Sequence, residues 1–194
     1  MRKLFLYMTM TLDGYIAGPN NELDWMVRTH DEELNADIAS LMLTADTGII
    51  GYPTAKDMIP YWAAVPNRPD ASQAEQNLAK VINKMHVIIL TNKEEHVDFV
   101  NAEQLLIKSD QDLISAVARL KQQAGKDIGV PGGVRTAQKI IRLGLADEYV
   151  LMVHPVTICK GQPIFIARTS LETMSAKAYA SGVVRLRFRP RVKA

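Results

Sequence analysis

Short apolar segments alternate with helical segments along most of this chain, and this alternation limits its fold more than any other feature. Nearly continuous apolar runs at residues 4–10 and 86–91 are typical of strands buried on both faces. Further strands are predicted at 47–51, 104–108, 127–130 and 148–158, and helices at 31–43, 52–58, 73–84, 110–124 and 134–143. This alternation predicts an α/β fold built on a mostly parallel sheet.

The end of the chain follows a different pattern. Residues 172–192 split at Ser181-Gly182 into two runs in which apolar and polar residues alternate, which predicts an antiparallel hairpin at one edge of the sheet. An edge strand can pair with another copy, so we expect a homodimer. Residues 60–69 contain three prolines and are predicted to be irregular. No linker or repeat interrupts the sequence, and residues 1–194 are expected to form a single domain.

Charge and cysteine content exclude several classes of protein. The formal net charge is +2 and no basic cluster stands alone on a predicted face, which argues against nucleic-acid binding. The single cysteine, Cys159, excludes an internal disulfide and a cysteine-rich zinc site. The four histidines lack metal-ligand spacing, and no apolar run is long enough to cross a membrane. We therefore expect a cytoplasmic protein with no metal, membrane or nucleic-acid partner.

Three predicted strand ends carry residues suited to a dinucleotide. Ligands of open α/β sheets bind outside the carboxyl ends of the strands, so the residues that follow the strands are the first candidates. Gly51 and the pair Gly132-Gly133 each open a helix, and the free N–H groups of a helix N-terminus attract phosphate. Thr91-Asn92-Lys93 ends another strand. No Walker lysine follows the glycines, which argues against phosphoryl transfer.

A series of short motifs resembles one protein family. The series consists of residues 11–17 (TLDGYIA), 51–54 (GYPT), 132–133 (GG), 144–148 (GLADE), 154–155 (HP) and 163–165 (PIF). The same order is found in the reductase domain of the bifunctional riboflavin-biosynthesis deaminase-reductase and in the dihydrofolate-reductase-like proteins grouped with it. The resemblance covers nearly the whole chain. It implies a three-layer fold with about eight central strands, and an NADPH-dependent reductase of a pteridine- or pyrimidine-like heterocycle.

The resemblance also implies which residues surround the cofactor. The nicotinamide is expected against Met10, Ile16 and Ala17. The adenosine is expected beside Thr91, Asn92 and Lys93. The phosphates are expected at Gly51, Tyr52, Pro53 and Thr54, at Gly132 and Gly133, and at Val134, Arg135 and Thr136. The double glycine is often a cis peptide in this family.

Departures from the family pattern leave the cofactor preference and the activity open. Tyr52 stands where the family often has an arginine for the 2′-phosphate, so NADH is not excluded beside NADPH. Lys93, Arg68 and Arg135 remain as alternative sources of positive charge. Asn35 and Val130 stand where related enzymes carry an acid. A catalytically inactive nucleotide-binding sensor or regulatory protein therefore stays as the alternative to an enzyme.

The sequence does not fix a proton donor. Reduction of a heterocycle needs a proton from a carboxylate, a tyrosine or a positioned water. The candidate catalytic acids are Asp13 and Asp37, although Asp13 also fits a turn. The candidates for substrate binding are Asp24, Trp25 and Asp57. Asp147 and Glu148 are predicted to be structural, because they begin a strand after the last helix.

Overall fold

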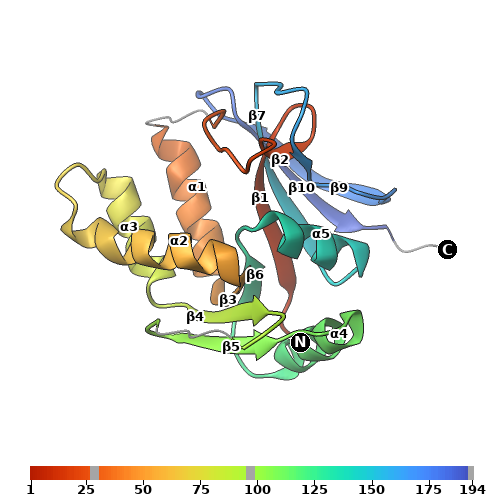
Figure 1. The fold of residues 1–194 in the computed structure, drawn as a ribbon. Helices are drawn as coiled ribbons and strands as arrows, with labels where there is room; N and C mark the ends of the chain where they lie inside the picture. The colour runs from red at the N-terminus through yellow and green to blue at the C-terminus, as the bar shows by residue number, and fades with distance from the viewer. Residues whose placement is uncertain (27–30, 95–98, 192–194) are drawn as a thin grey trace.

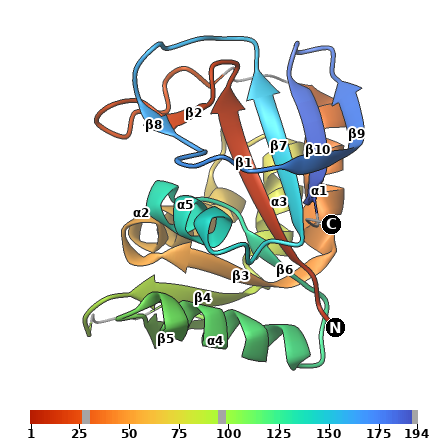
Figure 2. The same cartoon turned by 90° about the vertical axis from the view of Figure 1, so that its right-hand side faces the viewer.

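The computed structural model describes residues 1–26, 31–94 and 99–191 and shows helices on both faces of a central sheet (Figures 1 and 2). The strands are β1 (Leu4–Thr11), β2 (Tyr15–Ala17), β3 (Ala45–Gly51), β4 (His86–Thr91), β5 (Ala102–Leu106), β6 (Asp127–Val130), β7 (Glu148–His154), β8 (Gln162–Pro163), β9 (Leu171–Ala178) and β10 (Val184–Pro190). The helices are α1 (Glu32–Leu43), α2 (Tyr52–Ala64), α3 (Gln73–Ile82), α4 (Asp110–Gln122) and α5 (Val134–Arg142), with a 3₁₀ turn at Val65–Asn67. None of the helices in these ranges is long and apolar enough to cross a membrane.

The central sheet confirms the predicted α/β fold. Its eight strands lie in the order β5-β4-β3-β6-β1-β7-β10-β9. In this sheet order, each pair of neighbouring strands among β5, β4, β3, β6, β1 and β7 is parallel. Strand β10 is antiparallel to both of its neighbours, β7 and β9. The C-terminal hairpin therefore forms one edge as expected, although residue 192, its predicted end, lies outside the described residues. Pairing of this edge in a homodimer stays a prediction.

The apolar run of β1 explains why the sheet needs a helical layer on each face. Leu4 and Leu6 belong to the apolar cluster that includes residues of α4 and α5. Phe5 and Tyr7 point the other way and pack with residues of α1 and α3. Because successive side chains of a strand alternate between faces, a strand that is apolar at every position is stable only when both faces are covered.

Helix α2 extends through a segment predicted to be irregular. It continues past Pro60 to Ala64 and then passes into the 3₁₀ turn. Inside a helix, proline removes one backbone hydrogen bond and crowds the carbonyl four residues earlier, at a cost of about 3 kcal/mol. Ala55 and Ile59 pack against Ile50 and Ile89 of the sheet. Burial of this apolar face outweighs the lost bond, a balance that local sequence does not reveal.

Two further differences concern strand length. Strand β7 ends at His154, earlier than the predicted residue 158, because Pro155 has no N–H for the ladder of a central strand. Strands β2 and β8, which pair with each other, were not predicted. They have three and two residues, too few to show an alternating pattern.

Candidate functional site

Two helices begin at the carboxyl edge of the sheet without a capping side chain. Helix α2 starts at Tyr52 directly after Gly51, and α5 starts at Val134 directly after Gly133. The N-termini of α1, α3 and α4 each have an aspartate or serine side chain that accepts from a first-turn amide. The first N–H groups of α2 and α5 have no such acceptor in the described chain, and they keep their capacity to bind an anion.

These two helix starts touch each other. A Cβ atom built on Gly51 would lie 2.9 Å from Thr136 Oγ1, and one built on Gly133 would lie 2.9 Å from Thr54 Oγ1. Neither position has room for a side chain. Gly51, Thr54, Gly133 and Thr136, here called the glycine cradle, thus bring two hydroxyls and two helix N-termini together. The Gly132–Gly133 peptide bond is trans, whereas the family resemblance implied a cis bond.

The remaining residues of the two first turns surround the cradle. Tyr52 and Pro53 begin α2, and Lys56 Nζ lies 5.8 Å from the centre of the Tyr52 ring. Arg135 is exposed on the first turn of α5 and makes no ion pair or hydrogen bond with the described part of the chain. Arg68, another of the three proposed sources of charge, lies beyond the far end of α2, about 20 Å along a helix of this length. It pairs there with Asp70 at 2.8 Å.

The end of β4 lies beside the cradle. Leu90 of β4 is paired with Gly51 of β3. Thr91, the next residue of β4, therefore lies beside the glycine cradle. Thr91 is buried, and its hydroxyl accepts from Gln104 Nε2 at 3.0 Å. The same amide donates to the Lys93 carbonyl at 3.2 Å. Gln104 therefore shapes this strand end, although nothing in its local sequence marks it.

The end of β1 provides an apolar surface in the same row. Met10, Ile16 and Ala17, here called the β1 wall, are at most 9% exposed. Met10 and Ile16 share one apolar cluster with Val130, the last residue of β6. The pairing of β2 with β8 holds the second half of this wall in place. The sheet order β4-β3-β6-β1 thus brings the three groups of predicted cofactor residues to successive strand ends.

Trp25 reaches the same edge of the sheet, whereas two of the predicted acids are exposed. The Trp25 ring meets His154 edge to face, with ring centres 5.7 Å apart. His154 is paired with Thr11 at the end of β1, so Trp25 lies near the β1 wall. Trp25 Nε1 is buried without a hydrogen-bond partner in the described chain. Asp24 and Asp57 are both exposed.

Asp13 has a structural role. Its carboxylate accepts from Thr11 Oγ1 at 2.6 Å and from the Cys159 amide at 2.8 Å. These bonds attach the loop that follows β7 to the end of β1. The hydrogen bond from Thr11, followed by those from backbone amides, lowers the pKa of Asp13 below its usual value. Asp13 is thus ionised at neutral pH and poorly suited to donate a proton.

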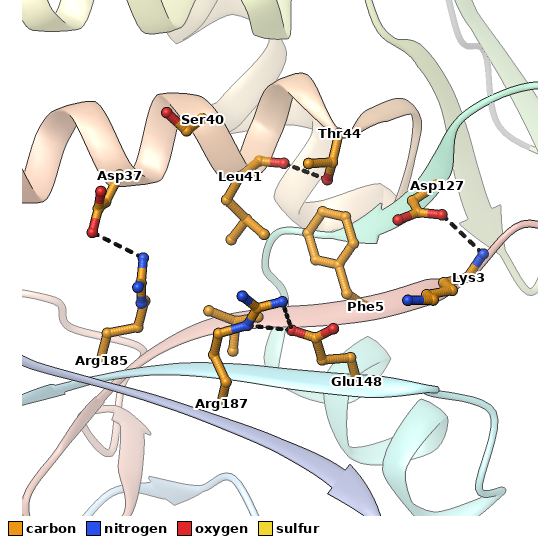
Figure 3. Close-up of a pocket in the computed structure, with 11 residues that line it drawn as sticks. Lys3, Phe5, Asp37, Ser40, Leu41, Thr44, Asp127, Glu148, Arg185 and Arg187 are labelled. Carbon is orange, nitrogen blue, oxygen red and sulfur yellow. Dashed lines mark hydrogen bonds and ion pairs between the residues drawn. The ribbon is translucent and has the colours of Figure 1, made fainter. Parts of the chain in front are cut away.

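Asp37 lies in a separate, charged pocket beneath α1, shown in Figure 3. Its Oδ2 accepts from Lys177 Nζ and Tyr179 Oη at 2.7 Å and from Arg185 Nη1 at 3.0 Å. The hydrogen bond from Lys177, then that from Tyr179, lowers the pKa of Asp37. The pocket, about 270 Å³, extends to Lys3, which directly precedes β1, away from the carboxyl ends of the strands. The structure does not bring Asp37 together with the glycine cradle.

The acids predicted to be structural are confirmed as such. Asp147 accepts from the Leu4 amide at 2.7 Å and pairs with Lys121 at 2.7 Å. Glu148 is buried and pairs with Arg187 at 2.6 Å. Both carboxylates join the start of β7 to neighbouring elements.

The described histidines do not gather at one place. His86 lies 3.6 Å from Glu103 across β4 and β5. His154 is buried at the end of β7, and burial lowers its pKa. His30 and His96 lie outside the described residues. In the ranges that the structure describes, no three His, Cys, Asp or Glu side chains are placed to hold a metal ion.

A mostly parallel sheet covered on both faces by helices, two of which start at adjoining carboxyl ends, defines an open α/β fold, a class whose ligands bind outside those strand ends. The chain matches the RibD C-terminal domain family over residues 2–185 and belongs to that family. Among its relatives, the uncharacterized protein YyaP of Bacillus subtilis is 28% identical over 188 residues, which cover 95% of this chain and 93% of YyaP.

Solved structures confirm the dihydrofolate-reductase-like fold. A protein assigned to riboflavin biosynthesis from Shewanella sp. PV-4 superposes with a TM-score of 0.74 at 17% identity, covering 98% of this chain and 99% of the other. Dihydrofolate reductase from Enterococcus faecalis, solved with NADP(H), superposes with a TM-score of 0.61 at 11% identity, covering 98% and 97%. At these identities the likeness concerns the fold.

Proposed function

We propose that this protein is a nicotinamide-dependent reductase that transfers hydride to a pteridine- or pyrimidine-like heterocycle. The glycine cradle carries the proposal, because two helix N-termini and two threonine hydroxyls converge there on one place. Membership of the RibD C-terminal domain family and the likeness to a reductase solved with NADP(H) support it.

The row of strand ends gives the cofactor an orientation. Its pyrophosphate would bind at the glycine cradle through the first amides of α2 and α5. From β4 to β1 the row spans three strand spacings, about 14 Å at roughly 4.8 Å each. We place the adenosine at one end, beside Thr91, Asn92 and Lys93. The nicotinamide belongs at the other end, against the β1 wall.

In this arrangement the protein binds the cofactor and the substrate, orients them, and excludes water from the reacting groups. The reduced nicotinamide supplies the hydride, and the buried β1 wall keeps water from one side of it. Trp25 Nε1 is a buried donor near the same strand ends, and we assign it to a carbonyl or ring nitrogen of the substrate. Because Asp13 and Asp37 are held ionised by other groups, we assign delivery of the proton to a bound water.

Nucleotide titration tests the proposal. In a Trp62→Phe variant, NADPH and NADH are expected to quench Trp25 emission saturably. Arg135→Ala should weaken the binding of both nucleotides at least tenfold, since a hydrogen bond to a charged group contributes about 1.5–3 kcal/mol. Arg119→Ala, an exposed arginine of α4, is the matched control and should bind as the parent does. Absence of saturable binding at millimolar nucleotide would overturn the cofactor assignment.

A nucleotide-binding protein without turnover is the second candidate. It is favoured by the observation that the carboxylates of Asp13 and Asp37 are both engaged in structural hydrogen bonds. Oxidation of NADPH in the presence of a dihydropteridine or an aminopyrimidine would decide for the reductase. Tight nucleotide binding with no oxidation by any such compound would decide for the sensor.

A further inference from the structure

A second cavity lies between the sheet and α2, on the face that also carries α1 and α3. Its volume is about 520 Å³. Strands β3 and β4 form its floor, and Met58 and Trp62 of α2 and Met85 after α3 are among its walls. Protein interiors contain few voids larger than a water molecule, whereas small-molecule sites usually measure roughly 300–1,000 Å³. The cavity therefore has the size of a ligand site.

The lining of this cavity is apolar and uncharged. None of the described side chains that form it carries a charge, and the hydrogen-bonding side chains among them are Asn83 and Trp62. The Asn83 amide already donates to the Trp62 carbonyl at 2.9 Å. A phosphate or carboxylate placed here would lose part of its hydration without gaining a charged partner, which is unfavourable. The cavity thus selects uncharged, apolar groups.

A glycine in the middle of a central strand keeps the floor of the cavity open. Gly48 lies in β3, between β4 and β6, where it is paired with Val87 and Gly129. A Cβ atom built on Gly48 would meet nothing within 4 Å. Glycine weakens a strand interior and often marks the close approach of a ligand. Gly48 fits this second pattern, because the space above it belongs to the cavity.

The cavity adjoins the glycine cradle. Pro131 lines the cavity and immediately precedes Gly132. Met58, another lining residue, has its sulfur 3.5 Å from the position that a Cβ of Gly132 would take. A molecule held in the cavity would therefore lie close to the Gly132-Gly133 turn that precedes α5.

We propose that this cavity binds an uncharged, apolar ring or hydrocarbon group, and that this group is the apolar part of the reductase substrate. The second half of the inference rests on the proposed function. It narrows the substrate to compounds with an uncharged aromatic or hydrocarbon portion.

Trp62 in the cavity wall provides the test. In a Trp25→Phe variant, the uncharged probe N-phenyl-1-naphthylamine is expected to quench Trp62 saturably with one site per chain. Gly48→Val fills the floor and should weaken the probe at least tenfold. The variant should melt no lower than its parent, because the new side chain enters open space and a β-branched residue favours a strand. Ala176→Val makes a similar change on exposed β9 and should bind the probe normally.

The outcomes separate this inference from the proposed function. Probe binding that is unsaturable, or that survives Gly48→Val, overturns the cavity assignment even when NADPH binds. A protein that binds the probe in this Gly48-dependent way but neither nucleotide keeps the cavity site and loses the reductase assignment. Competition tests the substrate class: the uncharged bicyclic ring quinoxaline should displace the probe, and ribose 5-phosphate should not. Displacement of the probe by ribose 5-phosphate but not by quinoxaline would overturn the proposed preference for apolar groups.

Discussion

Replacing Gly133 by alanine is expected to weaken NADPH binding at least 100-fold while the chain still folds. Gly133 has φ +86° and ψ +110°, a conformation that residues with a Cβ rarely adopt. The new methyl group would also lie 2.9 Å from Thr54 Oγ1, so the starts of α2 and α5 must separate. Their amides then no longer point at one anion. Backbone strain should lower the free energy of unfolding by about 2 kcal/mol, measured by denaturant titration.

Gly144→Ala is the matched control for this prediction. Gly144 lies just beyond the other end of α5 and also has a positive φ of +64°. No atom lies within 4 Å of the position that its Cβ would take. The variant should lose about 1–2 kcal/mol of stability through left-handed strain and keep the parent affinity for NADPH. Equal losses of affinity in the two variants would show that the effect follows stability, and the cradle would no longer be the phosphate site.

The layers of the fold follow from local patterns in the sequence. The continuous apolar runs of β1 and β4 predicted strands buried on both faces, and the helices between strands followed their 3.6-residue spacing. Gly144 correctly predicted the end of α5. Local patterns were not enough where packing competes with propensity, as at Pro60, because the contacts of α2 with β3 and β4 come from distant residues.

The candidate site was also predictable only where its residues carry local signals. Glycines and threonines after the strands are local signals, and the sheet order alone brings them into one row. The partners of the two candidate acids were not predictable in this way. Asp13 is bonded to Cys159, and Asp37 to Lys177 and Arg185, each more than a hundred residues away in the sequence. Gly48 was not singled out from the sequence, although a glycine inside a predicted strand can indicate the close approach of another group.

Asp37→Asn is expected to destabilise the protein without changing its affinity for NADPH. The substitution removes the charge shared by Lys177 and Arg185, and Arg185 Nε is already buried without a partner in the described chain. Breaking a buried ion pair costs roughly 3–5 kcal/mol. The Asp37 side chain is 26% exposed, so solvent screening reduces the expected loss to about 2 kcal/mol. Glu33→Gln is the control, because Glu33 also pairs with Lys177 but is 63% exposed and should contribute less than about 0.5 kcal/mol.

The pH dependence gives this prediction a second readout. The hydrogen bond from Lys177 lowers the pKa of Asp37 in the folded state, so the folded protein holds the ionised form more tightly than the unfolded chain does. Its stabilising contribution is complete above the unfolded pKa of about 3.9 and disappears as the pH falls through the folded value. The difference in stability between the parent and Asp37→Asn should therefore be constant near neutral pH and shrink below about pH 4. A variant of unchanged stability that binds NADPH but no longer oxidises it would instead identify Asp37 as the proton donor.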